Sequence, residues 1–128
     1  MKRLPAISDA EWDVLKVVWE HGPLTSGQIV QRLETERRWK PRTIKTLLAR
    51  LVRKGAVAAK EEDRRFLYFA KVGRDALVRR ESRSFLSRVF NGDVAPALLH
   101  FLKDARLDES DIDELKKILE DNARGSKS

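Results

Sequence analysis

The sequence contains no cysteine, one methionine, 4 prolines and 6 glycines in 128 residues. The absence of cysteine excludes disulfide bonds, thiolate zinc sites and thiol nucleophiles, and it is compatible with a reducing cytoplasm, where we expect the protein. Long apolar runs are also missing, and no signal core follows Met1-Lys2-Arg3-Leu4-Pro5. The sequence therefore predicts neither secretion nor membrane insertion.

Signatures of catalysis are missing as well. The sequence has no glycine-rich phosphate loop, no ordered serine, histidine and aspartate triad, and no His/Glu metal motif. Its two histidines, His21 and His100, have no acidic partners at metal-binding spacing. We therefore expect no metal, no cofactor and no enzyme activity.

The charge is distributed unevenly along the chain. Residues 1–72 hold 16 Lys and Arg against 9 Asp and Glu, a net charge of +7, whereas residues 73–128 hold 11 of each sign and are neutral. Between Arg37 and Lys60 there are nine basic residues and no acidic one. Such a run is either a solvated face or a binding surface for an anionic partner. We divide the chain into a basic N-terminal domain, 1–72, and a C-terminal region, 73–128.

Capping signals predict three helices in the basic half. Ser8 and Thr25 are each followed three residues later by Glu or Gln, which indicates a capping box. The first helix should end at Gly22-Pro23, and the second should give way to a loop over 34–38. The third spans about 41–54, with Pro41 at its start and Gly55 after its end.

The rest of the chain predicts a hairpin followed by helices. Residues 56–60 and 66–70 read as two strands joined by a loop over 61–65. Helical patterns then run from Gly73 to Phe90, from a cap at Asp93, and from a cap at Asp108 to a frayed tail over 124–128. The fold class is mainly α with a small β-hairpin.

The third predicted helix has two contrasting faces. At about 100° per residue, one side gathers the apolar residues Ile44, Leu47, Leu48, Leu51 and Val52. The opposite side holds basic or small residues: Arg42, Lys45, Thr46, Ala49, Arg50 and Arg53. A helix that served only packing would mix Glu with its Lys for intrahelical pairs. This one has no acidic residue.

A basic helix of this kind suits the major groove of DNA, which accepts one α-helix and is read by Arg, Lys and hydroxyl side chains. The shorter helix before it completes a helix-turn-helix, and the hairpin after it makes a winged helix. We expect base contacts from Arg42, Thr43, Lys45 and Thr46, phosphate contacts from Arg50, Arg53 and Lys54, and further DNA contacts from Lys40 and from the wing residues Arg64 and Arg65. The acidic residues Glu61, Glu62 and Asp63 would face the same polyanion.

Three tryptophans invite a base-stacking interpretation. Trp12 and Trp19 lie in the apolar first helix, and we assign them to the core. Trp39 precedes the basic helix and could pack beneath it or reach the sugar-phosphate backbone.

The C-terminal helices carry more apolar surface than three short helices can bury among themselves, so we expect a homodimer. The expected dimerisation residues are Phe85, Leu86, Val89, Leu98, Phe101, Leu102, Ile112, Leu115 and Leu119.

Six short stretches share one order and spacing: Ala10-Glu11-Trp12, Trp19, Thr43 to Leu51, Lys54-Gly55, Phe85-Leu86 and Asn91-Gly92-Asp93. In this order and spacing they resemble the penicillinase-repressor family, the BlaI, MecI and CopY repressors of bacteria. The resemblance implies a winged-helix DNA-binding domain, a helical dimerisation region and a homodimeric repressor on a dyad-symmetric DNA operator, such as that of a β-lactamase or stress-response operon.

The resemblance also bears on how repression ends. The copper branch of the family senses metal through a Cys-x-Cys pair, which this chain lacks. In the penicillinase branch a regulatory protease cuts between an Asn and a Phe, and the matching positions here are His100 and Phe101. A winged-helix activator, or a module that docks proteins through its basic surface, remains an alternative function.

Overall fold

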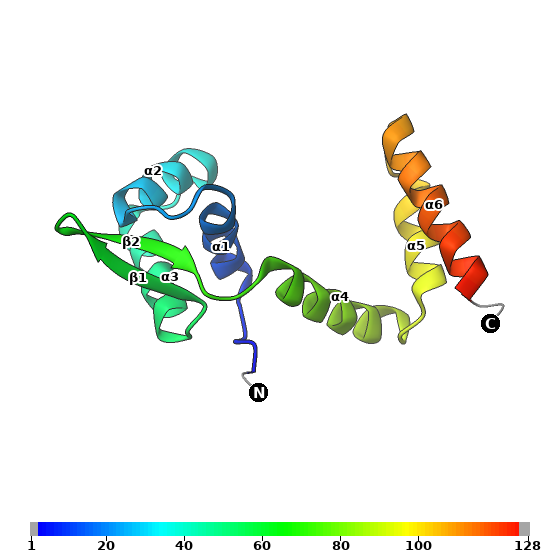
Figure 1. Cartoon of the computed structure of the whole chain (residues 1–128), viewed down its shortest axis with the longest axis horizontal. Helices are drawn as coiled ribbons and strands as arrows, with labels where there is room; N and C mark the ends of the chain where they lie inside the picture. The colour runs from blue at the N-terminus through cyan, green and yellow to red at the C-terminus, as the bar shows by residue number, and fades with distance from the viewer. Residues whose placement is uncertain (1–2, 126–128) are drawn as a thin grey trace. The chain divides into compact units, whose positions relative to one another are not determined.

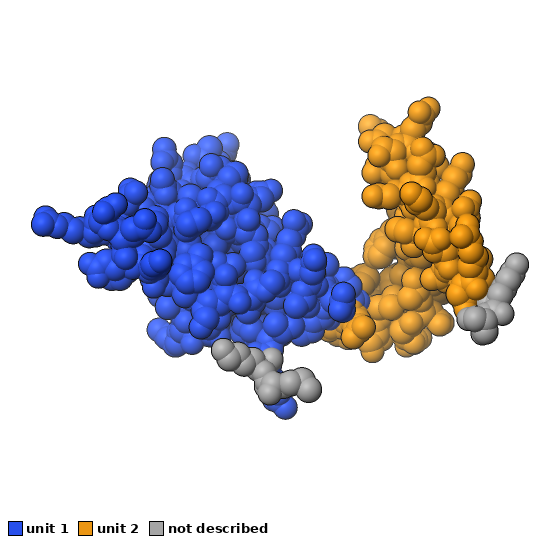
Figure 2. All heavy atoms as spheres, in the orientation of Figure 1, with its two compact units in different colours: residues 1–82 blue, residues 83–128 orange. Residues whose placement is uncertain are grey.

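The structure is a computed structural model that describes residues 3–125. Two compact units divide the chain, residues 1–82 and residues 83–128, and each is described by itself (Figure 2). The elements are α1 (Asp9–His21), α2 (Ser26–Arg37), α3 (Pro41–Arg53), β1 (Val57–Glu62), β2 (Arg65–Ala70), α4 (Arg74–Phe90), α5 (Val94–Lys103) and α6 (Glu109–Gly125).

The starts of the first three helices are confirmed. Ser8 Oγ accepts a hydrogen bond from the Glu11 N–H at 3.2 Å, and the Ser8 N–H donates to Glu11 Oε1 at 2.8 Å. Thr25 and Gln28 repeat this capping box at 3.2 and 2.9 Å. Pro41 occupies the first turn of α3. The two capping boxes satisfy backbone donors that the first turn leaves free, and Pro41 has no N–H that would need a partner.

Two predicted loops were too long. The expected loop over 34–38 is wrong, because α2 continues to Arg37 and ends where Arg38 turns left-handed at φ 58°. Glu and Arg are good helix formers, so a polar composition does not end a helix on the surface. The hairpin loop is also shorter than expected: Asp63 and Arg64 make a two-residue turn with φ of 52° and 66°.

The C-terminal caps differ in one detail from expectation. Asp108 Oδ1 accepts from the Asp111 N–H at 2.8 Å, as a helix cap should. Asp93 stands in the N-cap position of α5, but its side chain accepts no capping hydrogen bond. The tail expected over 124–128 is wrong for Arg124 and Gly125, which belong to α6; residues 126–128 lie outside the described part.

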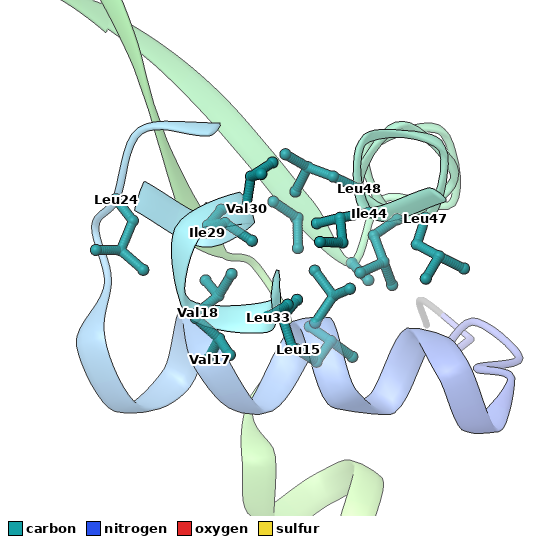
Figure 3. Packing of buried hydrophobic residues seen from close by; sticks show 14 of the residues in the cluster. Leu15, Val17, Val18, Leu24, Ile29, Val30, Leu33, Ile44, Leu47 and Leu48 are labelled. Carbon is teal, nitrogen blue, oxygen red and sulfur yellow. The ribbon is translucent and has the colours of Figure 1, made fainter. Parts of the chain in front are cut away.

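The core of the first unit lies where α1, α2 and α3 meet, with side chains from all three helices pointing toward one another (Figure 3). Leu15, Ile29 and Ile44 are each completely buried. The hairpin joins this core through β1 and through Leu24, whose N–H donates to the Tyr68 carbonyl at 3.1 Å. The three helices and the antiparallel hairpin form a winged helix (Figure 1).

The first unit extends into α4. Leu77 is completely buried in the same core, and the Arg80 guanidinium donates to the Leu4 and Pro5 carbonyls at 2.8 and 2.7 Å. The compact units therefore divide after Ser82, whereas the domain boundary expected from charge lies before α4. The expected boundary follows the change in charge along the sequence. The first turns of α4 lie beyond that change but still pack on the first unit.

The second unit has little interior of its own. Among residues 83–125, Ala97 is the only buried residue. An aromatic cluster joins α4 to α5, with the Phe85 ring stacked on Phe101 at a centroid distance of 6.0 Å and Phe90 at 6.2 Å from Phe101. Even so, Phe101 remains 53% exposed, and α6 contributes no buried side chain.

Within the described residues, no helix is both long and apolar enough to cross a membrane. No group of three His, Asp or Glu side chains in residues 3–125 is placed to hold a metal ion.

The core supports a direct stability prediction. Leu15 is completely buried between three helices, so Leu15→Ala should lower the free energy of unfolding by about 2–5 kcal/mol, through lost burial and a new cavity. Urea unfolding monitored by tryptophan fluorescence measures this change. Lys16→Ala, an exposed change on the same helix, is the control and should cost less than about 0.5 kcal/mol. Equal losses would contradict the assigned core.

Candidate nucleic-acid interface

The exposed side of α3 is the candidate interface. Ile44, Leu47, Leu48 and Leu51 are at most 6% exposed and hold the helix on α1 and α2. The opposite side is open to solvent along its length, and its exposed residues are Arg42, Thr43, Lys45, Thr46, Ala49, Arg50 and Arg53. Val52, which the helical pattern placed on the buried side, is 38% exposed, because it lies at the edge of that side.

The charge on this surface is not neutralised from within. Among residues 3–125, no acidic side chain pairs with Arg42, Lys45, Arg50 or Arg53. Arg37, in contrast, belongs to the same basic run but pairs with Asp13 at 2.9 Å. Repulsion between the unpaired cations is relieved when a polyanion binds, so the open surface of α3 favours an anionic partner.

The exposed side chains of α3 differ in the contacts that they can make with a partner. The Thr46 hydroxyl donates to the Arg42 carbonyl at 2.9 Å, so its remaining polar capacity is to accept a hydrogen bond, while its methyl group can meet apolar atoms. Ala49 is exposed and small, which lets a partner approach the helix backbone closely. Arg42 and Lys45, one turn apart, supply the donors that guanine recognition needs.

The start of α3 adds a fixed positive field. Lys40 is the N-cap residue and is exposed, and its side chain makes no capping hydrogen bond. Helix N-termini attract phosphate through their free N–H groups and the helix dipole. Trp39, the residue before it, packs against the hydrophobic core and is half-buried. The structure therefore favours the packing alternative for Trp39 over contact with the sugar-phosphate backbone.

The wing carries a mixed charge at its tip. Arg64 and Arg65 are both exposed, but Arg65 is paired in register with Glu62 on the neighbouring strand, and Asp63 shares the turn. Arg64 holds a left-handed backbone that costs about 1 kcal/mol or more for a residue with a side chain.

The Lys54 side chain contacts α1 and the segment before it rather than the exposed side of α3. Its ammonium group pairs with the Glu11 carboxylate at 2.5 Å and donates to the Ala6 carbonyl at 2.8 Å. Glu11 is 1% exposed and is the one buried charged residue in the part of the chain that the structure describes. The sequence pattern showed Glu11 only as a helix cap. The pair joins positions 43 residues apart, and no local spacing could indicate it.

Burial and pairing act in opposite directions on Glu11. Burial alone raises the pKa of its carboxyl group, but the hydrogen bond from Lys54, the hydrogen bonds from the Ser8 backbone and hydroxyl, and the charge of Lys54 together lower the pKa below its ordinary value of 4.5. Glu11 therefore carries its negative charge inside the protein at neutral pH.

A helix-turn-helix with a two-stranded wing and an uncovered basic recognition helix defines the winged-helix class of DNA-binding proteins. The penicillinase repressor family matches residues 7–121, and the chain belongs to that family.

Two relatives show how far the similarity extends. The penicillinase repressor of Bacillus licheniformis is 37% identical over 127 residues, which is 99% of each chain. The methicillin resistance regulatory protein MecI of Staphylococcus aureus strain N315 is 30% identical over 113 residues, covering 88% of this chain and 92% of that protein.

A solved structure agrees with the fold of the first unit. The monomeric form of Bacillus licheniformis BlaI in complex with the blaP half-operator matches with a TM-score of 0.53 and 39% identity. That match covers 59% of this chain and 92% of the BlaI chain.

The lowered pKa of Glu11 predicts a pH dependence. The carboxylate stabilises the folded protein above the unfolded value of 4.5, and this stabilisation is lost as the pH falls through the lower folded value. In Glu11→Gln, the free energy of unfolding should therefore fall less steeply with acidification than in the wild type. Urea unfolding between about pH 3 and 6 measures both slopes. Glu34→Gln, at an exposed position, is the control; equal slopes for all three proteins would refute the prediction.

Proposed function

We propose that this chain is a transcriptional repressor that binds a specific duplex DNA operator through α3. The observation that carries the proposal is the open, acid-free basic surface of α3, held in place by a buried apolar face on the same helix. The complex of the related BlaI with half-operator DNA, and the repressor names of relatives over nearly the whole chain, support it. The chain would act in the cytoplasm, without catalysis.

Within that function, the exposed residues divide by chemistry. Arg42, Thr43, Lys45 and Thr46, near the start of α3, would contact base edges in the major groove. Lys40, Arg50 and Arg53 would hold phosphates and set the orientation of the helix. Arg64 and Arg65 would add contacts from the wing. Lys54 is left out of this set, because its ammonium group is engaged by Glu11.

We propose further that the repressor is a homodimer joined through its C-terminal unit. In that unit, large apolar side chains stay in water: Val89, Leu99, Ile118 and Leu119 are between 53% and 65% exposed. Each of these side chains that a second copy fully buries would stabilise the dimer by about 1.5–3 kcal/mol. The other proposed interface residues are Phe85, Leu86, Leu98, Phe101, Leu102, Ile112 and Leu115. A two-fold dimer would read a pseudo-palindromic operator.

A regulatory protease would end repression by cutting between His100 and Phe101. The bond lies within α5, and Phe101 belongs to the aromatic cluster of the second unit, with the Phe85 and Phe90 rings at 6.0 and 6.2 Å. Both residues are exposed in the single chain, so a protease would reach the bond in a chain that is not covered by its partner. The cut would detach α6 and the end of α5, with most of the apolar surface proposed for the dimer.

An activator with the same fold is the alternative function. Footprinting on a promoter that contains the preferred DNA sequence separates the two functions. A repressor should protect DNA that overlaps the binding site of RNA polymerase. Protection only upstream of that site would favour the activator.

The proposed base contacts predict a loss of operator affinity. After selection of the preferred duplex from random DNA, Arg42→Ala and Lys45→Ala should each weaken binding by about 1–3 kcal/mol and relax preference at one base position. Fluorescence anisotropy at moderate salt measures the affinity. Lys117→Ala, an exposed basic residue of α6, is the matched control and should bind as the wild type does. Unchanged affinity in both α3 variants would remove this surface from the function.

The proposed dimer predicts a shift in sedimentation. Leu119→Glu places a charge on the apolar side of α6 in both copies and should weaken the dimer by about 100-fold or more. Lys117→Glu lies about 160° away around the same helix and should leave the dimer intact. Sedimentation velocity over a range of concentrations distinguishes them. A wild-type monomer well above micromolar concentration would contradict the proposal.

The proposed cleavage predicts the behaviour of a truncated chain. A protein of residues 1–100 keeps the winged helix but should be monomeric and should lose operator affinity, because each monomer reaches one half-site without a tethered partner. A chain of residues 1–125 is the control. If the 1–100 protein still dimerised and protected the whole operator at the same concentration, cleavage at this point could not relieve repression.

A further inference from the structure

The Lys54–Glu11 ion pair ties three segments of the first unit together. Lys54 follows the last residue of α3, Glu11 lies in the first turn of α1, and Ala6 belongs to the segment before that helix. Glu11 Oε1 accepts from both the Lys54 ammonium and the Ser8 N–H, and the same ammonium group donates to the Ala6 carbonyl. The C-terminal end of α3 is thereby attached to α1 by directional polar contacts.

Lys54 moves with α3. Its N–H donates to the Arg50 carbonyl at 2.9 Å, which continues the helical pattern, and its backbone keeps a right-handed helical conformation. The contacts of the Lys54 side chain therefore hold the C-terminal end of the helix. From Lys54 to Arg42 the helix rises by about 18 Å, so a tilt of about 5° about the Lys54 end displaces Arg42 by about 1.5 Å. Hydrogen bonds to base edges do not tolerate a displacement of that size.

The apolar contacts of α3 restrict this angle through interlocked packing. Ile44, Leu47, Leu48 and Leu51 hold the helix against its neighbours, and the ion pair adds a polar contact beyond them, at the C-terminal end of the helix. An ion pair with a buried carboxylate is directional, because the ammonium group must meet one oxygen within hydrogen-bonding distance. The net stabilisation from a buried ion pair is often small compared with that from apolar residues of the same size. The contribution that this pair can add to apolar packing is therefore a fixed attachment of the C-terminal end of α3 to α1 and to Ala6.

We propose that Lys54 and Glu11 are positioning residues, which set the angle of α3 for base recognition although neither touches DNA. This inference rests on the DNA-binding function proposed above. It assigns to Lys54 a role different from that of its neighbour Arg53, which is exposed and unpaired and would contact phosphate directly.

The test uses the full-length protein and compares operator with non-specific DNA. In the double variant Glu11→Met/Lys54→Met, apolar side chains of similar length replace the pair, so the fold should be retained. We expect its operator affinity to fall by about tenfold or more relative to its affinity for non-specific duplex, with an unchanged slope of log affinity against log salt. Lys54→Arg, which keeps the positive charge and a hydrogen-bond donor, should have a higher ratio than the double variant.

Arg53→Met is the matched control for a phosphate contact. It should weaken binding to both DNAs about equally and reduce the salt slope by about 0.9 for each subunit. All measurements are made at a temperature at which circular dichroism shows each variant folded, so that loss of stability does not enter the ratio.

Each result decides between roles. A wild-type operator ratio in the folded double variant would show that the pair is only structural, and a reduced slope in the same variant would show that Lys54 touches phosphate; either would overturn the inference. If the double variant does not fold, Glu11→Gln, which keeps the size of the side chain and an accepting oxygen but removes its charge, and Lys54→Arg still decide by the same ratio and salt slope. A wild-type protein that selects no DNA sequence would refute the proposed function instead, and the two failures are therefore distinguishable.

Discussion

Burial of one face of α3 is the constraint on which the rest of this structure depends. Ile44 and Leu51 are completely buried, and Leu47 and Leu48 nearly so. Once this face is pressed against α1 and α2, the helical period leaves the basic side chains no direction but outward. The same packing that stabilises the first unit thus presents an unneutralised cationic surface to solvent. Stability and the proposed DNA contacts therefore depend on opposite sides of one helix.

The exposed surfaces of the two units differ in how well water solvates them. In the first unit, the exposed side of α3 is charged and is well solvated until a polyanion replaces water and counterions. In the second unit, the exposed side chains are apolar, and water solvates them poorly. The basic surface is therefore suited to reversible, salt-dependent binding, whereas the apolar surface would be stabilised by burial, as in the proposed homodimer.

Local patterns predicted much of this arrangement. The capping boxes at Ser8 and Thr25 place the first two helix starts, and the amphipathic pattern of α3 separates its two faces. The errors arise where a local signal has more than one structural outcome. A run of polar residues after Leu33 suits a loop or an exposed helix equally well, and α2 continues. Likewise, the acidic and basic residues between the two strands belong largely to the strands themselves.

By itself, the sequence determined the elements of this protein, the buried side of α3 and the concentration of positive charge in the first half, because these follow from residue spacing over one or two turns. Only the tertiary structure decided which basic side chains have an acidic partner. Arg37 and Lys54 belong to the same basic run as Arg42 and Lys45, yet Asp13 neutralises the first and the buried Glu11 engages the second. Those acids lie 24 and 43 residues away along the chain, and folding brings them within reach because the core packs α1 against α2 and α3.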